Sequence, residues 1–176
     1  MTSRSILLVT SVLAAVGGVG CGGSRGTSSH DPTLPRLDGV YRRTQSAESV
    51  AQHDHVPVSQ ALAENYGDFV LVIRGTRFAF TQSNAKACTW QYGTLRVHSG
   101  RIEMLFIDGG GRAPDNAENK PGEHFVWKAS YFRGALALVP VTPTDLMAET
   151  WQRVSTTPTA SALTRGCRPP TAALSG

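Results

Sequence analysis

The sequence predicts an all-β fold, an antiparallel up-and-down barrel of eight strands, on three observations. From residue 37 onward, short apolar runs alternate with turn signals. Two pairs of these runs flank dipeptides typical of hairpin turns, at residues 99–100 and 133–134. No long helical periodicity separates the runs, so consecutive strands are expected to pair, and closing the sheet would remove its exposed edges. A two-sheet β-sandwich is the alternative, which the hairpin connections favour less.

Eight segments have the length and composition of strands. They are rich in β-branched and aromatic residues, and turn residues separate most of them. In chain order, the predicted strands are residues 39–45, 67–74, 77–82, 88–98, 101–108, 124–132, 135–141 and 150–155.

Two longer connections interrupt the series. Residues 46–66 are expected to be partly helical, with Ser46 capping one helical turn and Ser59 capping another that stops at Gly67. Residues 109–123 are polar and glycine-rich, which is typical of a mobile loop. The glycines at residues 109–111 lack the spacing of a phosphate-binding loop, so we interpret them as part of a turn.

The N-terminus has the pattern of a secretory signal. Arg4 precedes an apolar stretch, residues 6–19, which is short for a transmembrane helix and is weakened by glycines. Cys21 follows small residues, as in the bacterial lipobox, where the cysteine is diacylated, although Gly18 replaces the usual larger aliphatic residue. We therefore expect a signal peptide over residues 1–20, a lipidated Cys21 and a flexible tether over residues 21–36. A plain secreted protein with a stray cysteine is the alternative.

Composition limits the partners. The chain has 176 residues, of which 40% are hydrophobic and 17% charged, as expected of one globular domain. Its net charge of +4 is spread out, with no basic run longer than Arg42-Arg43, so we expect no nucleic-acid partner. Fourteen Arg against three Lys indicate a GC-rich genome. We expect a monomer, anchored by acyl chains to the extracytoplasmic face of the membrane of a high-GC Gram-positive bacterium.

Four stretches carry a family resemblance over residues 37–155. They are LDGVYRRT, GDFVLVIRGTRFAFTQ, CTWQYGTLRVHSGRIEM and TWQRVS, and together they resemble secreted bacterial lipoproteins with a lipocalin-like (calycin) barrel. In calycins the aromatic residue of a Gly-x-Trp motif plugs the barrel base, and an arginine of the last strand stacks on it. The motif here is Gly39-Val40-Tyr41, with Tyr in place of Trp. The resemblance implies that Tyr41 and Arg153 pack together at the base.

Two further cysteines, Cys88 and Cys167, lie in the fourth predicted strand and in the C-terminal tail. If Cys21 is acylated, these two remain in an oxidising compartment, where pairing is the expected outcome. The resemblance adds support, because many lipocalins join the fourth strand to the C-terminal tail in this way. A disulfide would hold the tail, residues 156–176, across the barrel. Two free thiols are the alternative.

No catalytic constellation can be named. The chain lacks a nucleophile elbow, a spaced carboxylate pair and a cofactor fingerprint, so we expect neither enzymatic activity nor a cofactor. An isomerase or hydrolase of a calycin-like barrel is the alternative. His53 and His55 form a His-x-His that suits zinc or copper. Solvated loop histidines are the simpler interpretation, and we expect no metal; candidate third ligands would be His30, His98 and His124.

Alternation along the strands assigns one face of each to the barrel interior. An eight-stranded barrel is either filled by side chains or holds one small ligand, and both readings stay open. A bulge at Gly93 would switch faces in the fourth strand. We predict an interior ligand site formed by Phe78, Phe80, Trp90, Tyr92, Met104, Phe106, Trp127, Leu136 and Leu138.

Two functions of different classes are compatible with these observations. The first is a lipid-anchored protein that binds a small apolar or amphipathic ligand in its barrel, with residues 46–66 partly covering the mouth. The second is a non-enzymatic interaction module with a filled barrel, which docks an envelope protein or glycan through its loops. In that case Arg42, Arg43, Arg112 and the loop of residues 109–123 are expected to be exposed and to make the contacts.

Overall fold

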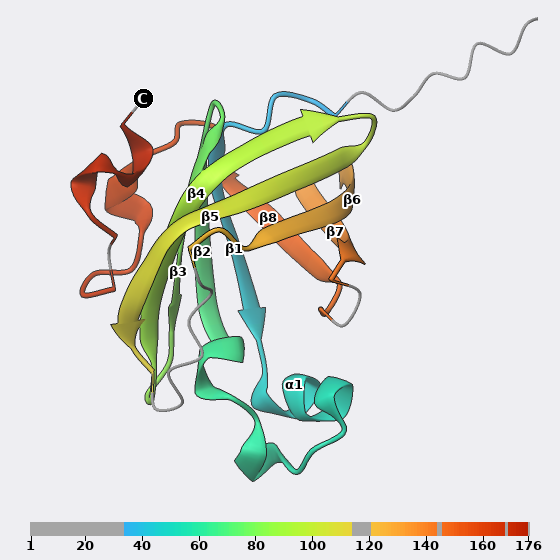
Figure 1. The fold of residues 1–176 in the computed structure, drawn as a ribbon, viewed down its shortest axis with the longest axis vertical. Helices are drawn as coiled ribbons and strands as arrows, with labels where there is room; N and C mark the ends of the chain where they lie inside the picture. Colours follow the sequence, from blue (N-terminus) through green and yellow to red (C-terminus); the bar gives the residue numbers. More distant parts are fainter. Residues whose placement is uncertain (1–33, 114–120, 144–145, 168, 176) are drawn as a thin grey trace, which may run out of the picture.

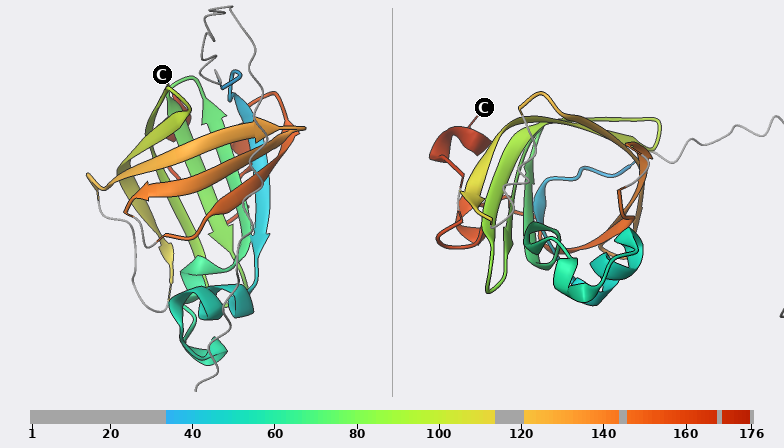
Figure 2. Two further views of the ribbon diagram at one scale, coloured as in Figure 1. Left: turned by 90° about the vertical axis from the view of Figure 1, so that its right-hand side faces the viewer. Right: turned by 60° about the horizontal axis from the view of Figure 1, so that its bottom comes forward.

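The computed structural model describes residues 34–113, 121–143, 146–167 and 169–175. The strands follow one another around a closed antiparallel barrel in chain order, and the last pairs with the first (Figures 1 and 2). This confirms the up-and-down barrel, rules out the sandwich and is consistent with a lipocalin-like fold. The strands are β1 (Gly39–Gln45), β2 (Gly67–Arg74), β3 (Arg77–Ser83), β4 (Cys88–His98), β5 (Arg101–Arg112), β6 (His124–Phe132), β7 (Ala135–Thr142) and β8 (Glu149–Ser155).

Several expectations fall outside the described residues. They are the signal peptide, the lipidated Cys21, the tether up to residue 33 and the central part of the connection between β5 and β6. Among the residues that are described, no helix is long and apolar enough to span a membrane.

β5 is longer than predicted. It continues to Arg112, so the glycines at residues 109–111 are strand residues and the predicted turn is wrong. Gly110 lies opposite Trp90 in the β4–β5 ladder. A Cβ on Gly110 would lie 2.8 Å from Cζ2 of Trp90, so the glycine makes room for the indole ring against the strand.

The connection between β1 and β2 holds α1 (Ala47–Asp54) and two turns of 3-10 helix, η1 (Val58–Gln60) and η2 (Ala63–Asn65). Ser46 caps α1 as predicted, because its Oγ accepts a hydrogen bond from the Ser49 N–H at 3.2 Å. The second predicted helix is wrong. Ser59 lies inside η1, which Pro57 precedes, and the backbone returns to an extended conformation at Ala61 and Leu62. This break separates η1 from η2.

Apolar side chains pack on both faces of the sheet. The main core lies inside the barrel, and a second cluster lies outside it, where Val70 and Val72 of β2 contact Leu163 and Leu174 of the C-terminal tail. The Cys88–Cys167 disulfide joins this tail to β4, across a sequence separation of 79 residues. The tail lies beside β3 and β4 in Figure 1. The predicted disulfide is thus present, and it holds a segment that covers the outer face.

Candidate ligand-binding site

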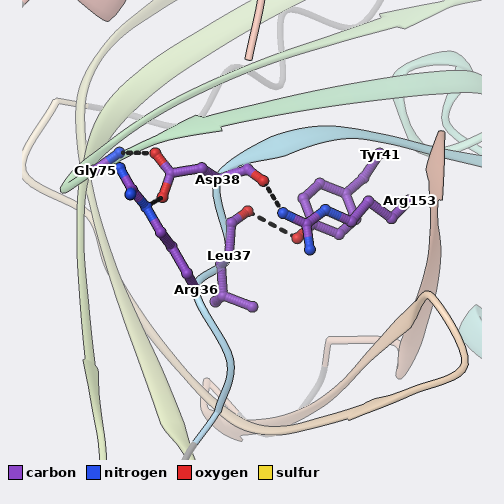
Figure 3. A network of polar contacts seen from close by, with 6 residues as sticks. All are labelled: Arg36, Leu37, Asp38, Tyr41, Gly75 and Arg153. Atoms are coloured by element: carbon purple, nitrogen blue, oxygen red, sulfur yellow. Dashed lines mark hydrogen bonds and ion pairs between the residues drawn. The ribbon is translucent and has the colours of Figure 1, made fainter. Parts of the chain in front are cut away.

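The barrel is closed at one end by Tyr41 and Arg153, the two residues that the family resemblance places there (Figure 3). Tyr41 is fully buried, and its hydroxyl donates a hydrogen bond to the Leu37 carbonyl at 2.7 Å. The guanidinium carbon of Arg153 lies 5.7 Å from the centre of the Tyr41 ring, and its Nη2 donates to the Asp38 carbonyl. Burial raises the pKa of Tyr41 to about 12. These contacts form a plug at the base.

Gly39 and Asp38 hold the start of β1 close to β8 and to the turn between β2 and β3. Gly39 has a φ of 150°, and a Cβ there would lie 2.3 Å from the Ser155 carbonyl oxygen, so only glycine lets β8 approach. The Asp38 carboxylate accepts hydrogen bonds from the Gly75 N–H at 2.9 Å and from Arg36 Nε at 2.6 Å (Figure 3). These hydrogen bonds lower the pKa of the Asp38 carboxyl group, and the bond from Gly75 has the largest effect.

The other end of the barrel contains a cavity of about 230 Å³, bordered by α1 and η2. Its volume exceeds that of an apolar cavity of about 150 Å³ that binds benzene. It falls below the range of about 300–1,000 Å³ found for drug-sized ligands. The interior is therefore hollow on the scale of a small molecule. The strand residues of its apolar wall are Phe69, Leu71, Phe80, Trp90, Met104, Phe106, Phe125, Trp127, Leu138 and Trp151.

Phe106 anchors this aromatic wall. Its ring centre lies 5.2 Å from that of Phe78, 6.2 Å from that of Phe80 and 5.0 Å from that of Phe125, each in an edge-to-face arrangement. Such pairs contribute about 0.5–1.5 kcal/mol each beyond the burial of their surface. The wall is therefore held in place without a ligand.

A charged pair lies beside the aromatic wall. Arg43 follows Tyr41 by two residues on β1, so its side chain also points into the barrel, where it is 13% exposed. Its Nη2 donates to Glu149 Oε1 at 2.8 Å, and its guanidinium carbon lies 3.9 Å from the Phe69 ring centre. Burial lowers the pKa of Arg43, while Glu149 opposes that shift. The expectation of an exposed Arg43 is wrong.

Polar residues at the end of β3 and just after it fix η2 at the mouth. Gln82 is fully buried, and its Nε2 donates to the carbonyls of Ala63, at 3.0 Å, and of Tyr66. Asn84 Nδ2 donates to the same two carbonyls, at 2.6 and 2.9 Å. Thr89 Oγ1 in turn donates to Gln82 Oε1 at 3.3 Å. The connection between β1 and β2 is thus hydrogen-bonded to the barrel rim.

Not all of the predicted interior residues line the cavity. Six of them do: Phe80, Trp90, Met104, Phe106, Trp127 and Leu138. Phe78 and Leu136 are fully buried in the core around it.

Tyr92 lies outside, against the cluster that the tail covers, so its assignment to the interior is wrong. Trp90 borders the cavity, but its ring stacks on Tyr92 with ring centres 6.1 Å apart. The pairing of β4 with β5 shifts register at Gly93, because Tyr92 pairs with Asp108 and Gly93 with Phe106. The extra residue of this bulge is Ile107, which belongs to β5 and not to β4. β4 therefore keeps its alternation.

Sequence reasoning missed Phe69, Trp151 and the Arg43–Glu149 pair as parts of this site. β2 gave no usable signal for Phe69, because five of its residues in succession are buried. Its inner face meets the core and its outer face meets the tail. Alternation from Tyr41 would have found Arg43, since residues two apart on a strand share a face.

The two histidines at the end of α1, His53 and His55, gain no third ligand in the described part of the chain. His53 Nδ1 lies 2.9 Å from Asp54 Oδ1, and His55 is exposed after the helix. His98 and His124 lie beside Glu103, at 2.7 and 3.8 Å, on β4–β6. Among the described residues, no three His, Cys, Asp or Glu side chains are grouped to hold a metal ion. His30 lies outside these residues.

Comparisons of the chain with protein-family models, with curated proteins and with solved structures found no match. A function must therefore be argued from the barrel and its cavity.

Proposed function

We propose that this protein binds one small apolar or amphipathic ligand inside its barrel. The observation that carries the proposal is the cavity of about 230 Å³ with a preformed aromatic wall. A filled barrel would leave room for one or two waters, each of which occupies about 30 Å³ in the liquid. The burial of Arg43 also removes one of the three arginines that an interaction module would present.

We further propose that acyl chains on Cys21 hold the protein, as a monomer, on the extracytoplasmic face of a bacterial membrane. The described chain enters the barrel at its closed end, through Leu37 and Asp38, whereas α1 and the cavity lie at the opposite end (Figures 1 and 2). An anchor that precedes Leu37 would therefore leave the mouth of the cavity unobstructed. Ligand binding of this kind requires neither a catalytic group nor a cofactor.

Ligand binding can be tested with toluene, an apolar probe slightly larger than benzene, in an NMR titration of amide shifts. Leu138 lines the cavity, whereas its neighbour Val139 is 51% exposed. Leu138→Trp fills the cavity, and Val139→Trp adds the same bulk outside. We expect saturable shifts in the wild type and in Val139→Trp that are lost in Leu138→Trp. An absence of saturable shifts in the wild type, or equal binding by all three proteins, would count against the proposal.

Lipidation is tested separately, by growing the producing cells with an alkyne-labelled palmitate. The wild type is expected to carry the label and to sediment with membranes. Cys21→Ser is expected to lose both properties, because the thiol is the attachment point. Label that persists on Cys21→Ser, or is missing from the wild type, would show that Cys21 is not the anchor.

A further inference from the structure

Five arginines that are scattered along the sequence lie at the closed end of the barrel. This end is formed by the entry segment, residues 34–39, and by the turns at residues 74–77, 98–101 and 132–135. Counted with the strand residues that flank them, these segments contain one carboxylate, Asp38, and the arginines Arg36, Arg74, Arg77, Arg101 and Arg133. The closed end therefore carries a net positive charge.

The opposite end, where the cavity lies, has the opposite charge. The connections at this end follow β1, β3, β5 and β7. Their described residues contain two cations, Lys86 and Arg112, and Arg43 inside the barrel adds a third. They contain five carboxylates: Glu48, Asp54, Glu64, Glu123 and Glu149. A negatively charged surface would therefore attract the closed end and repel the mouth of the cavity.

A surface groove at the closed end gathers hydrogen-bond donors that suit phosphate. Its wall includes three threonines and four arginines, Arg36, Arg74, Arg77 and Arg153. The one carboxylate of this wall, Asp38, already accepts from Arg36 Nε at 2.6 Å and from the Gly75 N–H at 2.9 Å (Figure 3). Glu103 of β5 is likewise engaged, by His98 at 2.7 Å. Guanidinium groups donate strong hydrogen bonds to phosphate oxygens, so the groove suits an anionic phosphate surface.

Phe132 places an apolar side chain beside this charge. It ends β6 and is 70% exposed, the largest fraction among the described large hydrophobic side chains. The Arg133 guanidinium carbon lies 5.0 Å from its ring centre. The Gly134 carbonyl accepts from the Arg153 N–H at 2.8 Å, so this turn lies next to the groove. An exposed aromatic ring among basic residues is typical of surfaces that bind the membrane interface.

The chain that precedes the barrel also enters at this end. Twelve residues lie between Cys21, the proposed acylation site, and Leu34. A tether of this length, rich in glycine and serine, spans about 20 Å on average. An acyl anchor would therefore keep the closed end close to the bilayer, which favours a lipid surface over a nucleic acid as the anionic partner.

We propose that the closed end of the barrel docks directly on an anionic phospholipid bilayer. Lipid phosphates would contact the arginines of the groove, and the Phe132 ring would enter the interface. This inference goes beyond the proposed function: the acyl anchor holds the protein near the membrane, and the docked closed end turns the mouth of the cavity away from it. Exposed charges are screened by ions, so salt should weaken the contact.

The test measures vesicle binding by sedimentation in the Cys21→Ser background, which has no acylation site. Vesicles of phosphatidylcholine are compared with vesicles of equal parts phosphatidylcholine and phosphatidylglycerol. Any affinity of the N-terminal residues for lipid is common to all variants and cancels. We expect the anionic lipid to strengthen binding, and Arg74→Gln with Arg77→Gln to reduce that gain about thirtyfold. Lys86→Gln with Arg112→Gln, which removes two cations from the opposite end, should change it little.

A second measurement locates the contact in the folded protein. In Cys21→Ser with Phe132→Trp, tryptophan emission should shift to the blue with the anionic vesicles, because the ring leaves water. Val139→Trp in the same background is the control, because Val139 is 51% exposed on β7, between the two ends of the barrel. Its emission should stay unchanged.

Equal losses in the two double variants, no gain from phosphatidylglycerol, or equal shifts at residues 132 and 139 would overturn the proposal. So would a DNA duplex that binds as tightly as the anionic vesicles and loses affinity in Arg74→Gln with Arg77→Gln, since the surface would then be a nucleic-acid site. The vesicle test uses neither the cavity nor Cys21, so its failure leaves the proposed function standing. A wild type without palmitate would instead refute the anchor alone.

Discussion

Tyr41 makes the closed end of the barrel sensitive to alkaline pH. Burial raises its pKa from 10.0 to about 12. Between these values the unfolded chain has released the phenolic proton while the folded chain retains it, so stability falls as pH rises. The contribution is complete below about pH 10 and is lost by about pH 12.

Tyr41→Phe should remove this pH dependence. At pH 7 the variant is expected to be less stable by about 1 kcal/mol, because the hydrogen bond to Leu37 is lost. From pH 10 to 12 its free energy of unfolding should fall less steeply than that of the wild type, as measured by urea denaturation at each pH. Parallel curves over this interval would contradict the assignment.

Arg43 and Glu149 are expected to depend on each other. Removing one leaves the other partly buried without its counter-charge. Arg43→Met and Glu149→Gln should each lower the free energy of unfolding by about 2 kcal/mol. The double variant should lose at least 1 kcal/mol less free energy of unfolding than the two single variants lose when their losses are added. Chemical denaturation of the four proteins measures this coupling, and additivity within about 0.5 kcal/mol would show that the pair does not interact in solution.

At the scale of single residues, the sequence predicts what lies inside only where one face of a strand is buried. Phe80, Met104 and Phe106 were found by alternation, and all three line the cavity. Tyr92 was misassigned because its outer face is also buried, by a tail that is distant in sequence. Apolar character alone does not distinguish the interior from such a covered exterior.

At the scale of elements, the C-terminal tail depends on the disulfide. Cys88 and Cys167 close a loop of 79 residues, which stabilises the fold by about 4 kcal/mol in the chain-entropy account. The double variant Cys88→Ser, Cys167→Ser should lower the free energy of unfolding by about 4 kcal/mol. It should also speed hydrogen exchange in β3, which the tail contacts. Cys21→Ser is the matched control and should change neither. An unchanged exchange rate would mean that packing alone holds the tail.

The start of β1 depends on Gly39. Gly39→Ala places a Cβ within 2.3 Å of the Ser155 carbonyl at a φ of 150°, so it should cost more than about 2 kcal/mol and loosen the pairing of β1 with β8. Gly75→Ala is the control, because it also has a positive φ, but no atom lies within 4 Å of its Cβ. It should cost about 1 kcal/mol. Thermal unfolding of both variants gives the comparison, and equal losses would show that the contact with β8 is not limiting.

The order and approximate bounds of the strands were predictable, because hairpin turns and alternation are local properties. The two element errors have a non-local origin. The glycines after Asp108 form a strand because Gly110 accommodates the Trp90 ring across the ladder. The connection after α1 adopts η2 in place of a longer helix, with Gln82 and Asn84 binding its carbonyls. In both cases the residues that decide the structure lie in another part of the chain, so the sequence of the segment alone does not indicate it.

At the scale of the whole molecule, closure of the barrel was predictable and its hollowness was not. The closed end was indicated by Tyr41 and Arg153, which now lie in contact. The cavity of about 230 Å³ depends on how the rings around Phe106 pack against one another, and on Arg43 occupying space inside the barrel. These are properties of the packed interior, and neither composition nor periodicity predicts them.

We propose above all that the barrel holds a small molecule. Native mass spectrometry of the protein purified from its own cells tests it most directly, with Leu138→Trp and Val139→Trp prepared alongside. We expect a non-covalent mass increment on the wild type and on Val139→Trp that is missing from Leu138→Trp. Ligand binding in the barrel would be contradicted if all three proteins carried only their covalent mass, both as purified and after incubation with toluene.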